Sequence, residues 1–177
     1  MNLNRPLLPP TASYEDPTMN YPIELNPDDD GSFIATFPDV PGAITYGSDR
    51  DEAVLQAADA LETMLAAIIA ARGDIPSPSP ACGRPTAGLG LLAAMKVAVY
   101  QAMRARGWRK ADLARELAVN PRQVDRLLNL RHASTVGQLA AALSACGRTV
   151  RVELEAPPSS RSASGAGQRR ACAASRS

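Results

Sequence analysis

Three polar side chains in the second half of this sequence have the types and spacing to read DNA bases. Arg122, Gln123 and Arg126 lie within one five-residue stretch. Arg can form a paired hydrogen bond to guanine and Gln to adenine, so these side chains at the exposed start of a helix would suit the major groove. Lys110 and Arg131 flank the stretch and are expected to hold phosphates.

The first half holds carboxylates that suit a different partner. Asp28, Asp29 and Asp30 are consecutive, and Asp39 stands in a proline-rich corner of the sequence. These residues are candidate contacts for a basic protein, because complementary charges speed the encounter of two proteins. The plainer interpretation is that they are turn residues at a solvated rim, where charges often contribute little.

Catalytic and metal chemistry find little support in the sequence. A two-metal nuclease needs several carboxylates that converge on ions about 4 Å apart, and Glu24 is the one acid within a predicted strand. The three cysteines are far apart, without a Cys-x-x-Cys pair, and His132 is the single histidine. We therefore expect no catalytic residue, no metal site and no cofactor.

The charge of the chain is divided between its halves. The 177 residues carry a net charge of +1. Residues 19–75 hold eleven acidic and two basic residues, a net charge of −9, whereas residues 91–155 hold eleven basic and five acidic residues, a net charge of +6. This asymmetry predicts that the second half favours phosphates and that the first half favours a basic protein.

Composition divides the chain into five segments. Residues 1–18 hold four prolines and predict a disordered arm, and residues 156–177, rich in Ser, Ala and Gly, predict a disordered tail. Residues 76–90 are rich in Pro and Gly, which predicts a semi-rigid linker. This leaves a first domain over residues 19–75 and a second over residues 91–155.

The first domain is predicted to contain a small antiparallel sheet. Three runs of strand-forming residues are bounded by turn residues, and they cover residues 21–25, 32–36 and 43–46. The first two runs are joined by Asn26-Pro27-Asp28-Asp29-Asp30-Gly31, which is typical of a hairpin turn whose Gly adopts positive φ. The three runs therefore predict a three-stranded meander.

One helix is predicted to follow the sheet. Asp49 can cap its first turn, Glu52 stands at the third helical position as in a capping box, and Gly73 is the expected stop. Polar residues interrupt the apolar stretch, so we interpret this helix as amphipathic rather than membrane-spanning. No secretory signal opens the sequence, and a cytoplasmic protein is expected. The face that would cover the sheet consists of Ala53, Ala57, Leu61, Leu65 and Ile68.

The second domain is predicted to be helical, and residues 110–128 carry its clearest motif. Asn120 can cap a second helix that has Pro121 at its first position and Gln123 at its third. The residues expected to face the core are Leu113, Ala114, Leu117, Val119, Val124, Leu127 and Leu128.

This pattern resembles the helix-turn-helix of phage-repressor-like transcription factors. It departs from that family at Ala118, where a Gly usually adopts the left-handed turn conformation, and Ala there costs about 1 kcal/mol. A plain helical hairpin with a solvated basic face is the alternative. Residues 149–154 alternate as a terminal strand, and a second copy of the chain is expected to pair with it and form a dimer.

A second resemblance concerns the first domain. The run Phe33-Ile-Ala-Thr-Phe-Pro-Asp-Val-Pro-Gly-Ala-Ile-Thr-Tyr-Gly47, with Tyr21-Pro22-Ile23 before it and residues 49–53 after it, resembles the core of HicB-type antitoxins. The prolines fix φ around Asp39 and Gly42 permits a sharp reversal, which predicts a rigid corner. With the repressor-like half, the resemblance extends over residues 21–154. The fourth strand of that family falls in the Gly-rich residues 84–90.

The resemblance implies a fold and two partners. It implies an α+β first domain with a small antiparallel sheet and one packed helix, a partial ribonuclease H-like fold, followed by an all-α helix-turn-helix domain. HicB proteins inhibit HicA, a small basic mRNA-cleaving ribonuclease toxin, and repress the shared operon at its operator DNA. We expect a homodimer or a higher even oligomer with no membrane partner. The alternative is a stand-alone transcriptional regulator whose first domain senses a small ligand or a protein.

Overall fold

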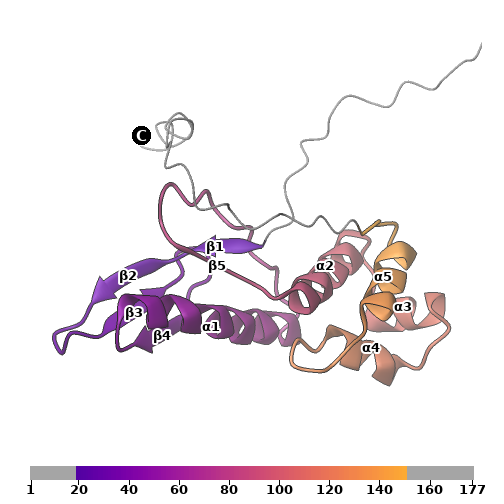
Figure 1. Cartoon of the computed structure of the whole chain (residues 1–177). Helices are drawn as coiled ribbons and strands as arrows, with labels where there is room; N and C mark the ends of the chain where they lie inside the picture. The colour runs from indigo at the N-terminus through magenta and orange to yellow at the C-terminus, as the bar shows by residue number, and fades with distance from the viewer. Residues whose placement is uncertain (1–18, 151–177) are drawn as a thin grey trace, which may run out of the picture.

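A computed structural model of the chain describes residues 19–150. Within them the protein is a mixed α/β structure with small antiparallel sheets and five helices, as predicted at this level. Figure 1 shows the long helix α1 lying along the sheets, with the other helices gathered beyond its C-terminal end. The predicted arm, the tail and most of the predicted strand over residues 149–154 lie outside the described residues.

Three strands form the predicted meander. Strands β2 (Glu24–Pro27), β3 (Phe33–Thr36) and β4 (Ile44–Gly47) pair antiparallel in the order β2-β3-β4. Directly opposite residues include Leu25, Ala35 and Thr45 across the three strands. Because side chains alternate along a strand, this row faces one side of the sheet and its neighbours face the other.

The first predicted strand is divided at Ile23, and its two parts pair with different strands. β1 (Asn20–Pro22) pairs antiparallel with β5 (Thr86–Gly88), whereas β2 pairs with β3. The Ile23 N–H donates to the Pro85 carbonyl at 2.8 Å, so the hydrogen bonding between the β1 and β5 segments continues one residue beyond β1. β5 lies within residues 84–90, where the family resemblance implied a fourth strand, so the linker predicted over residues 76–90 is interrupted there. A three-residue strand that ends in Gly has almost no sequence signal of its own, and distant pairing creates it.

Helix α1 (Arg50–Ala70) begins as predicted. The Asp49 carboxylate accepts a hydrogen bond from the Glu52 N–H at 2.8 Å. The expected reciprocal bond is shifted by one residue, because the Glu52 carboxylate accepts from the Ser48 N–H and hydroxyl at 2.8 and 2.5 Å. These hydrogen bonds from Ser48 hold the pKa of Glu52 below its usual value.

The other end of α1 differs from the prediction. The helix ends at Ala70, and Arg72, not Gly73, adopts the left-handed conformation with φ of 59°. The Gly73 N–H donates to the Ile68 carbonyl at 2.9 Å and the Arg72 N–H to the Ile69 carbonyl at 3.1 Å, which completes a Schellman ending.

One face of α1 packs on the sheets. Four of the five predicted core residues are buried, and Ile69 takes the place expected for Ile68, which is only partly buried. Within the described part of the chain, α1 is the one helix long and apolar enough to cross a membrane. Its buried stripe on strands β3, β4 and β5 is that of an amphipathic core helix. The buried stripe consists of Ala53, Ala57, Leu61, Leu65 and Ile69.

The remaining helices pack around α2. Helix α2 (Leu91–Ala105) contacts both α4 (Pro121–Leu128) and α5 (Val136–Ala145), and α3 (Lys110–Glu116) packs on α4. Lys96 of α2 is almost fully buried, and this burial lowers its pKa. Its ammonium donates to the Asn129 carbonyl at 2.6 Å and to the His132 carbonyl.

The buried phenol of Tyr21 supplies a prediction for stability against pH. Its hydroxyl donates to the Pro76 carbonyl at 2.7 Å, and burial together with the charge of Asp39 raises its pKa to about 12. An unfolded Tyr titrates near pH ~10, so the stability that this neutral phenol contributes is full below that pH and is lost as pH rises toward 12.

We expect Tyr21→Phe to lower the free energy of unfolding by about 1 kcal/mol at pH 8, because one hydrogen bond is lost. Urea titrations monitored by circular dichroism at several pH values would measure the difference from the native chain. That difference should shrink above pH ~10, since the variant has no phenol to ionise. A difference that stays constant up to pH ~11 would contradict the assignment.

Candidate nucleic-acid and partner interfaces

A short turn with one left-handed residue joins α3 to α4. Ala118 adopts the left-handed conformation with φ of 53°, as the resemblance to the repressors implied. The Val119 N–H donates to the Ala114 carbonyl at 2.9 Å, and Ala114 is buried where the two helices approach. The turn is therefore strained, because Ala118 has a Cβ at a position where Gly is usual.

The start of α4 is fixed by a reciprocal cap. The Asn120 side chain accepts from the Arg122 N–H at 2.9 Å, and the Gln123 side-chain oxygen accepts from the Asn120 N–H at 3.1 Å. Both bonds confirm the predicted capping. The second bond also occupies the side-chain oxygen of Gln123. The Gln123 side chain would have to leave the cap before its amide could make a paired contact with adenine.

The two faces of α4 divide as predicted. Val124, Leu127 and Leu128 are buried, whereas Arg122, Gln123 and Arg126 are exposed. Within residues 19–150 no ion pair involves Arg122 or Arg126, so both guanidinium groups remain available to an anionic partner.

The two predicted phosphate contacts have neighbours within the protein. The Lys110 ammonium lies 2.6 Å from an Asp125 carboxylate oxygen, which joins α3 to α4 and offsets its charge. Arg131 donates to the Thr63 hydroxyl of α1 at 2.9 Å. Both side chains are exposed, but neither is as free as Arg122.

A hollow of about 320 Å³ lies beside α4. Gln123, Arg126 and His132 contribute to its lining, together with residues of the turn after α3 and of α5. The sequence identified the three side chains separately, and the loop between α4 and α5 brings His132 next to the exposed face of α4.

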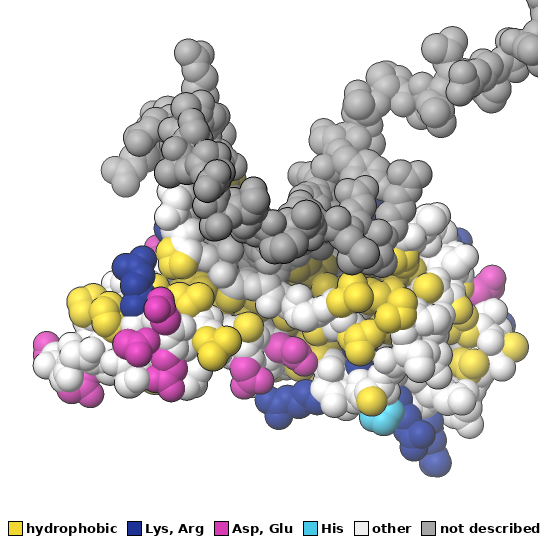
Figure 2. Space-filling view, viewed as in Figure 1, with side chains coloured by type: hydrophobic (Ala, Val, Ile, Leu, Met, Phe, Trp, Pro, Cys, Tyr) yellow, Lys and Arg dark blue, Asp and Glu magenta, His cyan; other side chains and the backbone are white. Residues whose placement is uncertain are grey.

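The acidic hairpin tip lies at the opposite end of the molecule. Asp28, Asp29 and Asp30 are exposed between β2 and β3. Two of the carboxylates stabilise the turn, since Asp28 accepts from the Asp29 N–H and Asp30 from the Ser32 N–H, each at 2.9 Å. Hydrogen bonds from Ser32 lower the pKa of Asp30, which therefore stays charged at neutral pH. Figure 2 shows acidic side chains at this end and along α1.

Asp39 is not part of this tip. Its carboxylate accepts from the Ser79 N–H at 2.8 Å and from the Ser79 hydroxyl at 3.0 Å. The predicted partner contact thus fixes the Pro-rich segment against the corner between β3 and β4. The bond spans forty positions of sequence, and for that reason the local pattern gave no sign of it.

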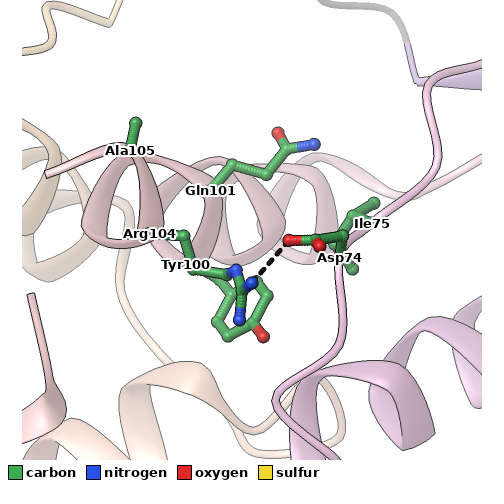
Figure 3. A pocket seen from close by; sticks show the side chains of 6 residues that line it. All are labelled: Asp74, Ile75, Tyr100, Gln101, Arg104 and Ala105. Atoms are coloured by element: carbon green, nitrogen blue, oxygen red, sulfur yellow. Dashed lines mark ion pairs between the residues drawn. The ribbon is translucent and has the colours of Figure 1, made fainter. Parts of the chain in front are cut away.

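A second hollow, of about 330 Å³, lies where the end of α1 meets α2. Figure 3 shows Arg104 reaching toward Asp74 beside Tyr100, and the Arg104–Asp74 ion pair is 2.6 Å long. The Tyr100 hydroxyl donates to the Gly73 carbonyl at 2.7 Å. Sequence reasoning missed this junction. Its exposed ion pair and the Tyr100 hydrogen bond join the end of α1 to α2.

The carboxylate considered for a nuclease is also engaged. Glu24 lies 3.6 Å from the Arg84 guanidinium on the outside of β2. In the part of the chain that the structure describes, no group of three or more His, Cys, Asp or Glu side chains is placed to hold a metal ion.

Known proteins match this chain over most of its length. A family described as HicB_like antitoxin of bacterial toxin-antitoxin system matches residues 20–98, which include all five strands, α1 and the start of α2. Antitoxin HicB 1 of Photorhabdus laumondii subsp. laumondii is 31% identical over 137 residues, which cover 77% of this chain and 88% of the relative. Antitoxin HicB 2 of the same organism is 34% identical over 130 residues, 73% of this chain and 92% of the relative. Antitoxin HicB of Escherichia coli (strain K12) is 31% identical over 131 residues, 73% of this chain and 95% of the relative.

The strained turn gives a stability prediction. Ala118→Gly should raise the free energy of unfolding by up to about 1 kcal/mol, because Gly adopts positive φ without a Cβ clash. The matched control is Gly107→Ala, at a position with φ of 67° and open space around the new Cβ. This control should lower stability by about 1 kcal/mol. Chemical denaturation of both variants measures the two changes, and a destabilised Ala118→Gly variant would disprove the strain.

Proposed function

The chain belongs to the HicB antitoxin family, and from this premise we propose that it inhibits a small HicA-type toxin that cleaves mRNA and represses the toxin-antitoxin operon. The first half of the chain binds the toxin and the second half binds operator DNA. The protein acts in the cytoplasm as a regulator without catalytic activity of its own.

The observation that carries the toxin-binding role is the exposed acidic tip of the β2–β3 hairpin. Asp28, Asp29 and Asp30 take part in no ion pair of the described residues, so their charge faces solvent. An RNA-cleaving toxin must present basic side chains to hold a polyanion. A surface that occupies this basic face needs negative charge, which the tip supplies. Asp39 contributes by holding the corner behind it.

The DNA-binding role rests on α4. Its exposed face carries Arg122, Gln123 and Arg126 above a buried face, and its start is capped. In this role Arg122, Gln123 and Arg126 contact base edges, while Lys110 and Arg131 contact phosphates. Two copies of the chain bind two half-sites of the operator, and the terminal segment over residues 149–154 joins them.

The DNA-binding role predicts a specific loss. Arg122→Ala should weaken binding to the operator by about 1 to 3 kcal/mol, roughly tenfold to over a hundredfold, and relax the preference at one base position. Arg148→Ala, an exposed arginine outside the helix-turn-helix, is the matched control and should change affinity little. Fluorescence anisotropy with operator and scrambled duplexes at two salt concentrations distinguishes them. Equal losses of affinity for both variants, on both duplexes, would mean that the arginines attract DNA nonspecifically, and would contradict base reading by Arg122.

The neutralising role is tested by rescue of growth. An antitoxin gene is expected to lie beside a short reading frame for a basic protein, and that neighbour is induced in cells, with and without the full chain and with an Arg122→Ala/Arg126→Ala variant. We expect growth to stop when the neighbour is induced alone and to recover with either antitoxin form. A harmless neighbour, or rescue that needs the DNA-binding residues, would favour the stand-alone regulator instead.

A further inference from the structure

The face of the meander that points away from α1 is exposed at its β4 end, whereas at its β2 end Glu24 is paired with Arg84. Along β4, Ile44 is 51% exposed and Tyr46 is 58% exposed. Gly47 lies on the other face of the same strand. It is buried against the first turn of α1, where a Cβ would lie 2.2 Å from the Ala53 nitrogen. Because side chains alternate along a strand, Ile44 and Tyr46 point away from α1.

The neighbouring strand extends this patch. Ile34 of β3 lies directly opposite Tyr46, and Thr36 lies opposite Ile44. Directly opposite residues share a face of the sheet, so Ile34, Ile44 and Tyr46 form one apolar patch, the outer sheet face. Among residues 19–150, Tyr46 is the one aromatic residue that is exposed to solvent.

The edge of the sheet beside this patch is also unprotected. β4 is the last strand of the meander, and its sequence Ile-Thr-Tyr-Gly has neither charge nor proline. At the opposite edge of the meander, β2 carries both Glu24 and Pro27, and Ile23 just before it is paired with Pro85. Proteins usually blunt an exposed edge with a charge or a proline, so the bare β4 edge indicates a partner rather than solvent.

The rim of the patch is acidic at one end. Pro27 lies opposite Phe33, and Phe33 lies opposite Gly47, so the hairpin tip of Asp28, Asp29 and Asp30 adjoins the Tyr46 end. Protein interfaces combine an apolar centre, often with Tyr as an anchor, and a polar rim. The outer sheet face and the hairpin tip together have this composition.

We propose that the outer sheet face is the centre of the surface on which the toxin docks, with the hairpin tip as its charged rim. This inference rests on the proposed function, because it assigns the occupant by charge: the patch suits a basic protein with an apolar contact. A second copy of this chain fits less well, since it would bring together two halves that each carry a net charge of −9.

The outer face of α1 is the competing surface and supplies a control. Leu55 is 78% exposed there, with the exposed Asp51 and Asp59 one turn away on either side. Figure 2 shows the acidic side chains along α1. This face has negative charge but a single large apolar side chain, so it lacks the apolar centre that the outer sheet face offers.

The test compares two variants of the full chain, Ile44→Ser/Tyr46→Ser and Leu55→Ser, with the native protein. The probe is the purified product of the neighbouring short reading frame, and calorimetry measures its affinity. We expect the sheet variant to bind at least about 30-fold more weakly, as loss of a central anchor does, and Leu55→Ser to bind within about threefold of the native chain. Operator affinity and circular dichroism should be unchanged in both.

Hydrogen exchange of the native chain with and without the probe provides a second measurement that needs no variant. The β4 amides should gain protection on binding, and those around Leu55 should not. The proposal is overturned by a loss confined to Leu55→Ser, or by protection confined to α1. An altered oligomeric state of the sheet variant with unchanged probe affinity would assign the face to a second copy. If the native chain itself fails to bind the probe, the proposed function fails rather than the choice of surface alone.

Discussion

The carbonyl groups that follow α1 are the constraint on which the arrangement of the two halves depends. The carbonyls of the turn after α1 need hydrogen-bond donors, and a helix from the other half supplies them. Tyr100 donates to the Gly73 carbonyl at 2.7 Å and Arg104 to the Arg72 carbonyl at 2.5 Å. The left-handed conformation of Arg72 turns the chain toward α2. Without these donors the joint would lose its directional contacts.

A second set of contacts joins α2 to the loop that follows α4. The buried ammonium of Lys96 binds the Asn129 and His132 carbonyls, which fixes the loop that follows α4. Arg131 in that loop reaches Thr63 of α1. The orientation of α4 relative to α1 is therefore held by backbone acceptors and one side-chain contact. Any anion that bound Arg131 would compete with Thr63 for the same guanidinium.

Features that depend on neighbouring residues could be predicted from the sequence, and features that depend on distant ones could not. The cap at Asn120, the buried face of α4 and the cap at Asp49 follow from residues within four positions of one another, and the structure has them all. The division at Ile23 and the Asp39–Ser79 contact arise from pairing over tens of residues, and strand β5 was expected from the family resemblance alone. The ending of α1 differs because tertiary donors favour a left-handed Arg72 over the nearby Gly73.

The length of α1 indicates how far apart the acidic and the basic parts of the chain lie. Helix α1 has 21 residues, which at ~1.5 Å per residue span roughly 30 Å between the meander and the helical half. This distance is several times the Debye length of about 8 Å at physiological salt, so the acidic tip and the exposed arginines of α4 change each other's electrostatic potential very little. Any coupling between these two surfaces must therefore pass through contacts, among them those at the end of α1 and at Thr63.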